Sequence, residues 1–158
     1  MAGLAGKAKD AIADAEASAM RVNQALDRYL RSSILGVQQV LVNRAGAILR
    51  DVALRSPVDT GRFRAAWGPG FEALGMPEPP ISKLTLAAAM EGRRNGSASV
   101  TMTDEKAEAI ITNGVSYGPF LEAGFSPQAP SGFVRRTLDE HAARLMDDIR
   151  RVEVDGVR

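Results

Sequence analysis

Mostly hydrophobic residues recur every three or four positions along the first third of the chain. This period places side chains on one face of a helix. The stripe is formed by Val22, Leu26, Tyr29, Ser33, Val37, Leu41, Ala45, Ile48 and Val52. The pattern predicts a long helix from Met20 to Leu54. Pro57 marks its end, because the residue before a proline avoids the helical region.

The stretch after this helix is rich in glycine and proline. Residues 68–81 read GPGFEALGMPEPPI, a composition that predicts an exposed loop without regular structure. Ser82 is the expected N-cap of a short helix over residues 83–93.

Apolar and polar residues alternate in the middle of the chain. In residues 97–103, Ala98, Val100 and Met102 fall on one face, and serine or threonine on the other. A period of two predicts a half-buried strand. Residues 107–112 are the expected partner strand of an antiparallel hairpin.

The last third returns to helical spacing. A short helical turn is expected over residues 117–123, stopped by Gly124, and a final helix begins near Phe133. The apolar stripe of that helix is formed by Val134, Leu138, Ala142, Leu145, Ile149 and Val152. The elements together predict an α+β fold: a long N-terminal helix, a small antiparallel β-sheet, and a C-terminal helix packed on the sheet.

The length of 158 residues suits a single domain with one modest core. We assign residues 20–153 to that domain, 1–19 to an N-terminal extension and 154–158 to a C-terminal tail. The extension alternates alanine with charged residues. It therefore predicts a helix that is frayed or dependent on a partner.

Composition excludes some kinds of site. The chain has no cysteine, which excludes disulfides and thiolate metal sites. Neither a secretory signal nor a membrane-spanning run is visible. We expect no cofactor, no metal and no membrane partner, as in a cytosolic protein or a particle assembled in the cytosol.

An Asp-Thr-Gly triplet at Asp59 resembles the catalytic triplet of aspartic proteases. That chemistry needs two carboxylates that share a proton, and a dimer would have to supply the second. Proline precedes the triplet and a basic segment follows it, where a protease has apolar strands. We therefore interpret Asp59 or Thr60 as an N-cap, with Pro57 at the first helical position. A hydrolase using Asp59 is the weakest hypothesis.

His141 is the only histidine, so no zinc site can be completed with a second histidine or a cysteine. No Gly-x-Ser-x-Gly elbow is present for a catalytic triad. We interpret His141 as a solvated or packed helix residue, and the adjacent Asp147 and Asp148 as solvated. The prediction is that the protein is not an enzyme.

Arginine pairs lie beside predicted turns, at residues 62 and 64, 93–94 and 135–136. Such clusters can contact phosphates without reading a base sequence, so an arginine-mediated nucleic-acid-binding module is an alternative function. The net charge of +1 gives that alternative no further support. The other interpretation is that these arginines form salt bridges to a neighbouring subunit or face solvent.

Two stretches in order resemble one family. The first motif, SPVDTGRFRAAW (residues 56–67), is similar to Pro-Val-Asp-Thr-Gly-Arg-Leu-Arg-x-Ser. The second motif, VSYGPFLEAGFSPQAPSGFVRRTLDE (residues 115–140), is similar to Tyr-Ala-x-Tyr-x-Glu-x-Gly-Thr followed by Ala-x-Pro-Phe-x-Arg-Pro-Ala-Leu. Both occur in the tail-completion or neck proteins of long-tailed phages. The matching residues are Pro57, Asp59, Thr60, Gly61, Arg62, Arg64, Tyr117, Glu122, Gly124, Ala129, Phe133, Arg135 and Leu138. Phe63, Phe125 and Arg136 depart from the usual leucine, threonine and proline.

The resemblance implies a structural virion protein without a catalytic role. Such a subunit forms a homo-oligomeric ring, expected to be a hexamer, at the head–tail junction or the top of the tail tube. Its implied partners are head-closure or connector proteins and the tail-tube protein, with genomic DNA passing through the ring. The implied location is the virion neck or tail, assembled in the bacterial cytoplasm.

The resemblance and the positions of the charges suggest two residue groups. The expected ring interface consists of Arg62, Arg64, Glu122 and Arg135. The expected structural turns and caps are Pro57, Asp59, Thr60, Gly61 and Gly124. We expect the arginine side chains to reach the surface and to serve assembly more than folding.

Overall fold

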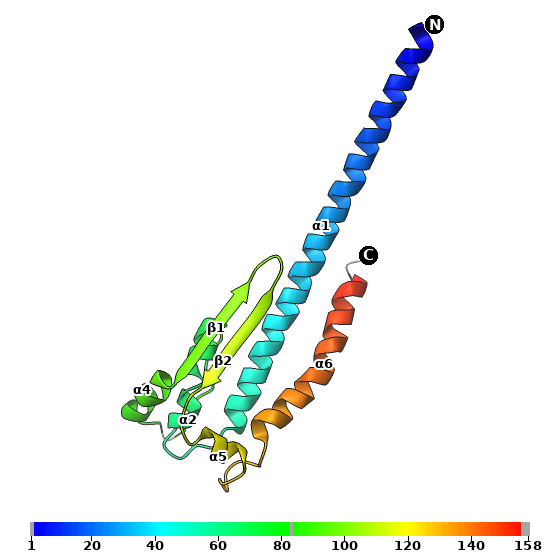
Figure 1. Ribbon diagram of the computed structural model, residues 1–158. Helices are drawn as coiled ribbons and strands as arrows, with labels where there is room; N and C mark the ends of the chain where they lie inside the picture. The colour runs from blue at the N-terminus through cyan, green and yellow to red at the C-terminus, as the bar shows by residue number, and fades with distance from the viewer. Residues whose placement is uncertain (1, 83, 156–158) are drawn as a thin grey trace.

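The computed structural model describes the backbone of residues 2–82 and 84–155, and the side chains of residues 20–24, 27, 31, 34–82 and 84–152. The predicted α+β class is confirmed (Figure 1). The elements in chain order are α1 (Ala2–Arg55), α2 (Arg62–Ala65), α3 (Gly68–Ala73), α4 (Leu86–Arg94), β1 (Gly96–Met102), β2 (Ala107–Asn113), α5 (Gly118–Glu122) and α6 (Phe133–Asp155).

Helix α1 is continuous over 54 residues, and its N-terminal part extends away from the rest of the molecule (Figure 1). The expected boundary between residues 19 and 20 therefore falls inside one helix. The predicted stripe is buried only toward the C-terminal end, where Val52 is 3% exposed, whereas Val22 is 65% exposed. The stripe side chains of Leu26, Tyr29 and Ser33 lie outside the described residues. Within the described residues, no helix is long and apolar enough to cross a membrane.

The antiparallel hairpin is confirmed. Strand β1 begins and ends one residue earlier than predicted, and β2 ends one residue later than predicted. Its register runs from Gly96 opposite Asn113 to Met102 opposite Ala107. Helix α3 packs mainly against β1, and α1 packs against β2 and along α6. The hairpin, α1 and α6 therefore lie side by side (Figure 1).

The prediction of an irregular loop over residues 68–81 is wrong at its start. Residues Gly68–Ala73 form α3, and Phe71 is 2% exposed. Proline in the first turn of a helix loses no hydrogen bond, so Pro69 is tolerated there. A Cβ on Gly70 would lie 2.7 Å from Ile111 Cγ2 and 3.0 Å from Leu49 Cδ2. The glycine thus permits close packing rather than a flexible loop.

The helix expected from residue 83 begins later. Helix α4 starts at Leu86, and the Thr85 hydroxyl caps it by accepting a hydrogen bond of 3.1 Å from the amide of Ala88. Ser82 is therefore not the N-cap. Lys83, the expected first helical residue, lies outside the described residues.

Aromatic residues organise a core between α1, α2, α3 and the start of α6. Trp67 is 8% exposed. Phe63 contacts it edge-on, with ring centroids 6.0 Å apart. The indole Nε1 donates to the hydroxyl of the buried Ser56 at 3.1 Å, so the polar end of the ring is also satisfied.

Candidate subunit-interaction site

The two motifs lie together at the C-terminal end of α1. The ring of Phe63 from the first motif is 6.1 Å from that of Tyr117 and 6.2 Å from that of Phe133, both from the second. The amide of Val58 donates to Gln128 Oε1 at 3.0 Å. Segments about fifty residues apart therefore form one packed unit.

Arg62 connects three parts of this unit. Its Nη1 lies 2.9 Å from Glu91 Oε1 on α4, and its guanidinium carbon lies 5.4 Å from the centre of the Tyr117 ring. Burial raises the pKa of the Tyr117 hydroxyl, and the Arg62 charge opposes that shift. The Arg62 side chain is 30% exposed, so part of it is accessible to a neighbouring subunit while these internal contacts are in place.

Arg64 is directed into its own subunit. Its Nη2 donates to the carbonyl of Leu54 at 3.0 Å and to that of Ser56 at 2.7 Å. Burial lowers the pKa of its guanidinium from the ordinary value. The expectation that this side chain extends into solvent is wrong, because the end of α1 offers carbonyl groups that need donors.

Glu122 caps the last helix. Its two carboxylate oxygens accept hydrogen bonds from the amides of Val134, at 3.0 Å, and Arg135, at 3.1 Å. A negative charge is favourable at this end of a helix. Glu122 therefore has a role within the subunit, whereas the side chain of Arg135 is exposed. A contact of Glu122 and Arg135 with a neighbouring subunit stays a prediction.

The turn after α1 is built differently from the prediction. The N-cap of α2 is Gly61, at φ 82°, which has no side chain to cap the helix. Neither Asp59 nor Thr60 is the N-cap residue, but the Thr60 hydroxyl accepts a hydrogen bond of 3.5 Å from the amide of Arg62, the first residue of α2. Gly61 is needed because of its positive φ and because a Cβ would lie 2.7 Å from Leu84 Cδ1.

Two other turn assignments hold. Helix α1 ends at Arg55, two residues before Pro57, as expected. Pro57 itself lies between α1 and α2, so its assignment to a first helical position is wrong. Gly124, at φ 92°, lies just beyond the end of α5, where a glycine commonly ends a helix.

A line of polar residues joins α1 to α6, and we call it the polar seam. It consists of Arg44, Asp51 and Arg55 on α1, and of Thr137, Glu140, His141 and Asp148 on α6. The α1 residues are spaced by seven and four positions, which places them on one helix face. This spacing in the sequence could have indicated a polar face on α1. The partners on α6 become known only when the two helices are seen packed together.

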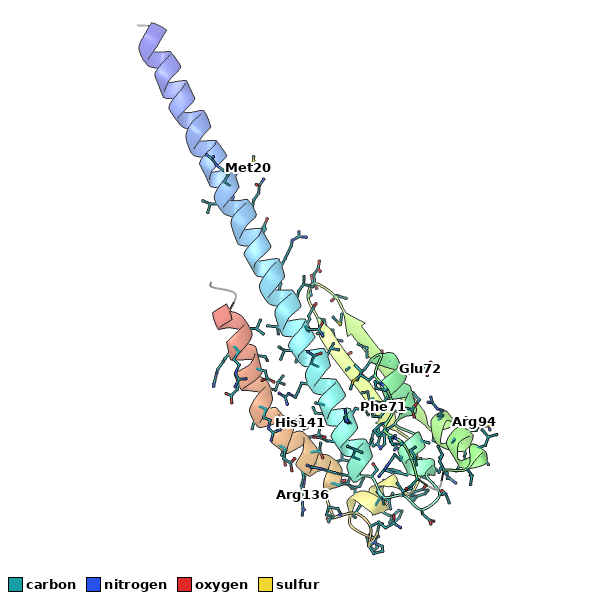
Figure 2. All side chains as sticks on the ribbon, turned by 180° about the vertical axis from the view of Figure 1, so that it is seen from behind. Met20, Phe71, Glu72, Arg94, Arg136 and His141 are labelled. Atoms are coloured by element: carbon teal, nitrogen blue, oxygen red, sulfur yellow. The ribbon has the colours of Figure 1, made fainter. Side chains whose placement is uncertain are left out.

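His141 is at the centre of the polar seam and is 3% exposed (Figure 2). Its Nδ1 lies 3.2 Å from Arg44 Nη1, and its Nε2 lies 2.8 Å from Asp51 Oδ2. Arginine can only donate, so Nδ1 accepts and Nε2 carries the proton that binds Asp51. The packed interpretation of His141 thus holds. Asp148 is not simply solvated as expected, because it pairs with Arg44.

Arg55 closes the end of the polar seam. It donates to Thr137 Oγ1 at 2.9 Å and to Glu140 Oε2 at 2.7 Å. Hydrogen bonding to Arg55 lowers the pKa of Glu140, and the same bond raises the pKa of Arg55. The ion pair therefore links the C-terminal part of α1 to the first turns of α6.

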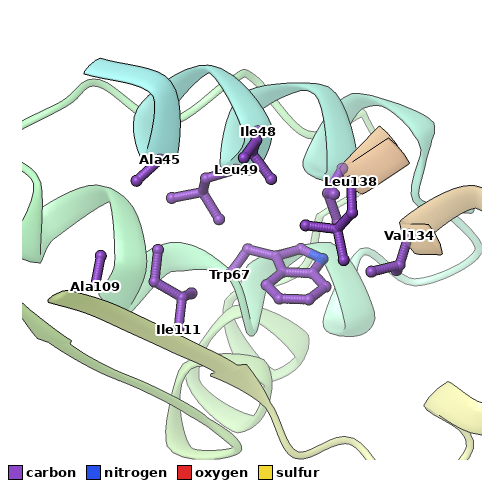
Figure 3. A pocket seen from close by; sticks show the side chains of 9 residues that line it. Ala45, Ile48, Leu49, Trp67, Ala109, Ile111, Val134 and Leu138 are labelled. Atoms are coloured by element: carbon purple, nitrogen blue, oxygen red, sulfur yellow. The ribbon is translucent and has the colours of Figure 1, made fainter. Parts of the chain in front are cut away.

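An apolar groove runs along α1 between β2 and α6 (Figure 3). Its central hollow has a volume of about 250 Å³, and adjoining hollows share its lining at both ends. The apolar groove is defined by Ile48, Leu49, Trp67, Ile111, Val134 and Leu138. Its lining provides apolar contact area and no cluster of reactive groups.

Among the residues whose side chains are described, no group of three or more histidine, aspartate or glutamate residues could hold a metal ion. No family model matches the chain, and neither does any curated protein or solved structure.

Proposed function

We propose that this chain is a structural subunit of a ring in the neck, or at the top of the tail tube, of a long-tailed phage or a phage-like particle. The ring completes the tail and joins it to the head. The observation that carries the proposal is the packing of the two motifs against each other through Phe63, Tyr117 and Phe133. Motifs that define one structural unit are expected to meet in space, and these do.

The arginines favour a structural role over nucleic-acid binding. Arg62 pairs with Glu91, Arg93 pairs with Glu78, and Arg55 pairs with Glu140. A carboxylate beside a guanidinium occupies some of its N–H donors and repels an approaching phosphate. The net charge of +1 also provides little attraction for a polyanion.

The proposal includes no catalytic step. Both ring nitrogens of His141 are engaged within the polar seam, so this histidine has no free nitrogen to act as a base. Asp59 lies in an exposed turn and would depend on a second copy for a partner carboxylate. A protease or phosphodiesterase activity that is lost in Asp59→Asn would contradict this part of the proposal.

The oligomeric state tests the proposal directly. Mass photometry and electron microscopy of the purified protein should detect closed rings, expected to be hexamers, with a central opening. DNA binding should be measured on the same sample at several salt concentrations. A stable monomer whose DNA affinity falls steeply with salt would instead favour the nucleic-acid-binding module.

A further inference from the structure

We propose that the apolar groove of one subunit binds an aromatic pair, Phe120 and Phe125, of a second copy of this chain. The inference rests on the proposed function, because it supplies the contact between neighbouring subunits of the ring. It assigns that contact to apolar surfaces rather than to the arginines.

The two phenylalanines form a preorganised projection, which we call the aromatic knob. Phe120 is 62% exposed and Phe125 is 78% exposed. Their rings are 6.1 Å apart at an angle of 80°, and the amide of Phe125 donates to the carbonyl of Phe120 at 3.1 Å. The positive φ of Gly124 turns the chain back so that the two rings meet. The knob therefore needs little ordering before it binds.

The apolar groove has space because small residues line part of it. Ala45 on α1 and Ala109 on β2 face the central hollow (Figure 3). Leu138 on its rim is 47% exposed, although it belongs to the apolar stripe of α6. The edge of β2 away from β1 has no strand beside it in the described chain.

Both halves of the proposed contact occur on one chain, so a second copy of this chain can supply the knob. Neither Phe120 nor Phe125 lines the three hollows of its own groove. A knob that docks into a different patch on the next copy makes a heterologous contact, and such contacts generate rings when the rotation closes. An aromatic side chain buries about 150–250 Å² when it is enclosed, so two such side chains supply the apolar centre of an interface.

Cross-linking tests the placement, because the chain has no cysteine. Ser126→Cys beside the aromatic knob and Ala109→Cys in the groove are made as separate variants, mixed, and treated with a short bismaleimide. We expect a dimer that contains one chain of each variant. Ser99→Cys, on the exposed face of β1, replaces Ser126→Cys in the control. Equal cross-linking of the control and the test pair would overturn the inference.

Two assembly variants provide an independent measurement. Phe120→Ala/Phe125→Ala removes the knob, and Ala109→Phe fills the groove. Each should weaken association at least tenfold, and an equal mixture should give dimers only, since only one productive contact remains. Leu86→Ala/Met90→Ala, which removes two exposed apolar side chains of α4, is the matched control and should assemble normally. Thermal unfolding confirms that each variant is folded.

The outcomes separate the two proposals. If the wild-type protein and both assembly variants form rings, the proposed contact between knob and groove is wrong. The proposed function as a ring subunit is then still supported. If the wild-type protein stays monomeric, the proposed function fails and this inference fails with it. If the variants form rings but no longer bind a different neck or tail protein, the groove serves that protein and a second copy is the wrong occupant.

Discussion

The last carbonyl groups of α1 are satisfied by side chains from the segment that follows the helix. Arg64 takes the carbonyls of Leu54 and Ser56. The hydroxyl of Ser56 donates to the carbonyl of Val52 at 2.8 Å and accepts from Trp67. One arginine, one serine and one tryptophan thus hold the end of the helix and the first motif together.

We predict that Arg64→Ala lowers the free energy of unfolding by about 2 kcal/mol, because hydrogen bonds from a charged donor to otherwise unpaired carbonyls are lost. From the sequence alone we expected Arg64 to serve assembly more than folding, and its internal partners reverse that expectation. Urea unfolding followed by the fluorescence of Trp67, the only tryptophan, measures the change. Arg135→Ala, on an exposed side chain, is the control and should change stability by less than about 0.5 kcal/mol. Equal effects of the two variants would contradict the prediction.

Close contacts between elements depend on two helical glycines with different surroundings. A Cβ on Gly92 in α4 would lie 2.3 Å from the carbonyl oxygen of Arg62 and 2.8 Å from Ala65 Cβ. A Cβ on Gly46 in α1 would instead lie 2.3 Å from the sulfur of Met76. Backbone cannot move aside easily, whereas the end of a methionine side chain can.

Gly92→Ala should therefore destabilise the protein by about 1–3 kcal/mol, as overpacked substitutions do. Gly46→Ala should be close to neutral, because the displacement of Met76 is offset by a gain in helix propensity of up to about 1 kcal/mol. Both substitutions make the same chemical change in a helix, so each controls for the other. The prediction fails if thermal unfolding shows equal losses for the two variants.

The link between α1 and α6 should weaken in acid. Arg55 holds the pKa of Glu140 below its ordinary value, so this pair stabilises the folded state above the unfolded pKa of about 4.3. That contribution is lost as the pH falls through the lower pKa of the folded state. Glu140→Gln should therefore reduce stability near neutral pH and flatten its fall in acid. Melting temperatures measured across the acid range test this, with Glu105→Gln in the hairpin turn as the control. A curve for Glu140→Gln parallel to that of the wild type would refute it.

Local patterns predicted the elements whose sequence signal is local. The hairpin follows from alternation, and α1 and α6 follow from helical periodicity. Helix α3 could not be predicted in this way, because Gly68 and Gly70 are there for contacts with other elements rather than for a loop. The partners of Arg64 are backbone carbonyls, which no side-chain pattern encodes. The motifs located the candidate site, but its internal ion pairs and the apolar groove depend on how the helices and the hairpin pack.

At the scale of the whole molecule, the packed body depends on only part of α1. The buried α1 residues of the core begin at Leu49, and Gly36 lies against Val152 near the end of α6. Deletion of residues 2–19 should therefore change the melting temperature by less than about 2 °C, which for a chain of this size corresponds to at most about 1 kcal/mol. Deletion of residues 2–40 is the contrasting variant and should lower it clearly. A large loss from the shorter deletion would place part of the folding unit before Met20.

The length of α1 also sets a distance. At 1.5 Å per residue, the 32 residues from Ala2 to Ser33 span about 48 Å. In a ring, every subunit would carry one such rod, and all of the rods would have the same length and the same angle to the ring. A set of helices of equal length acts as a spacer. Any partner protein that binds the N-terminal ends of these helices would therefore be held at a fixed distance from the ring. Shortening the rod by whole helical turns would then change that separation in steps of about 5.4 Å.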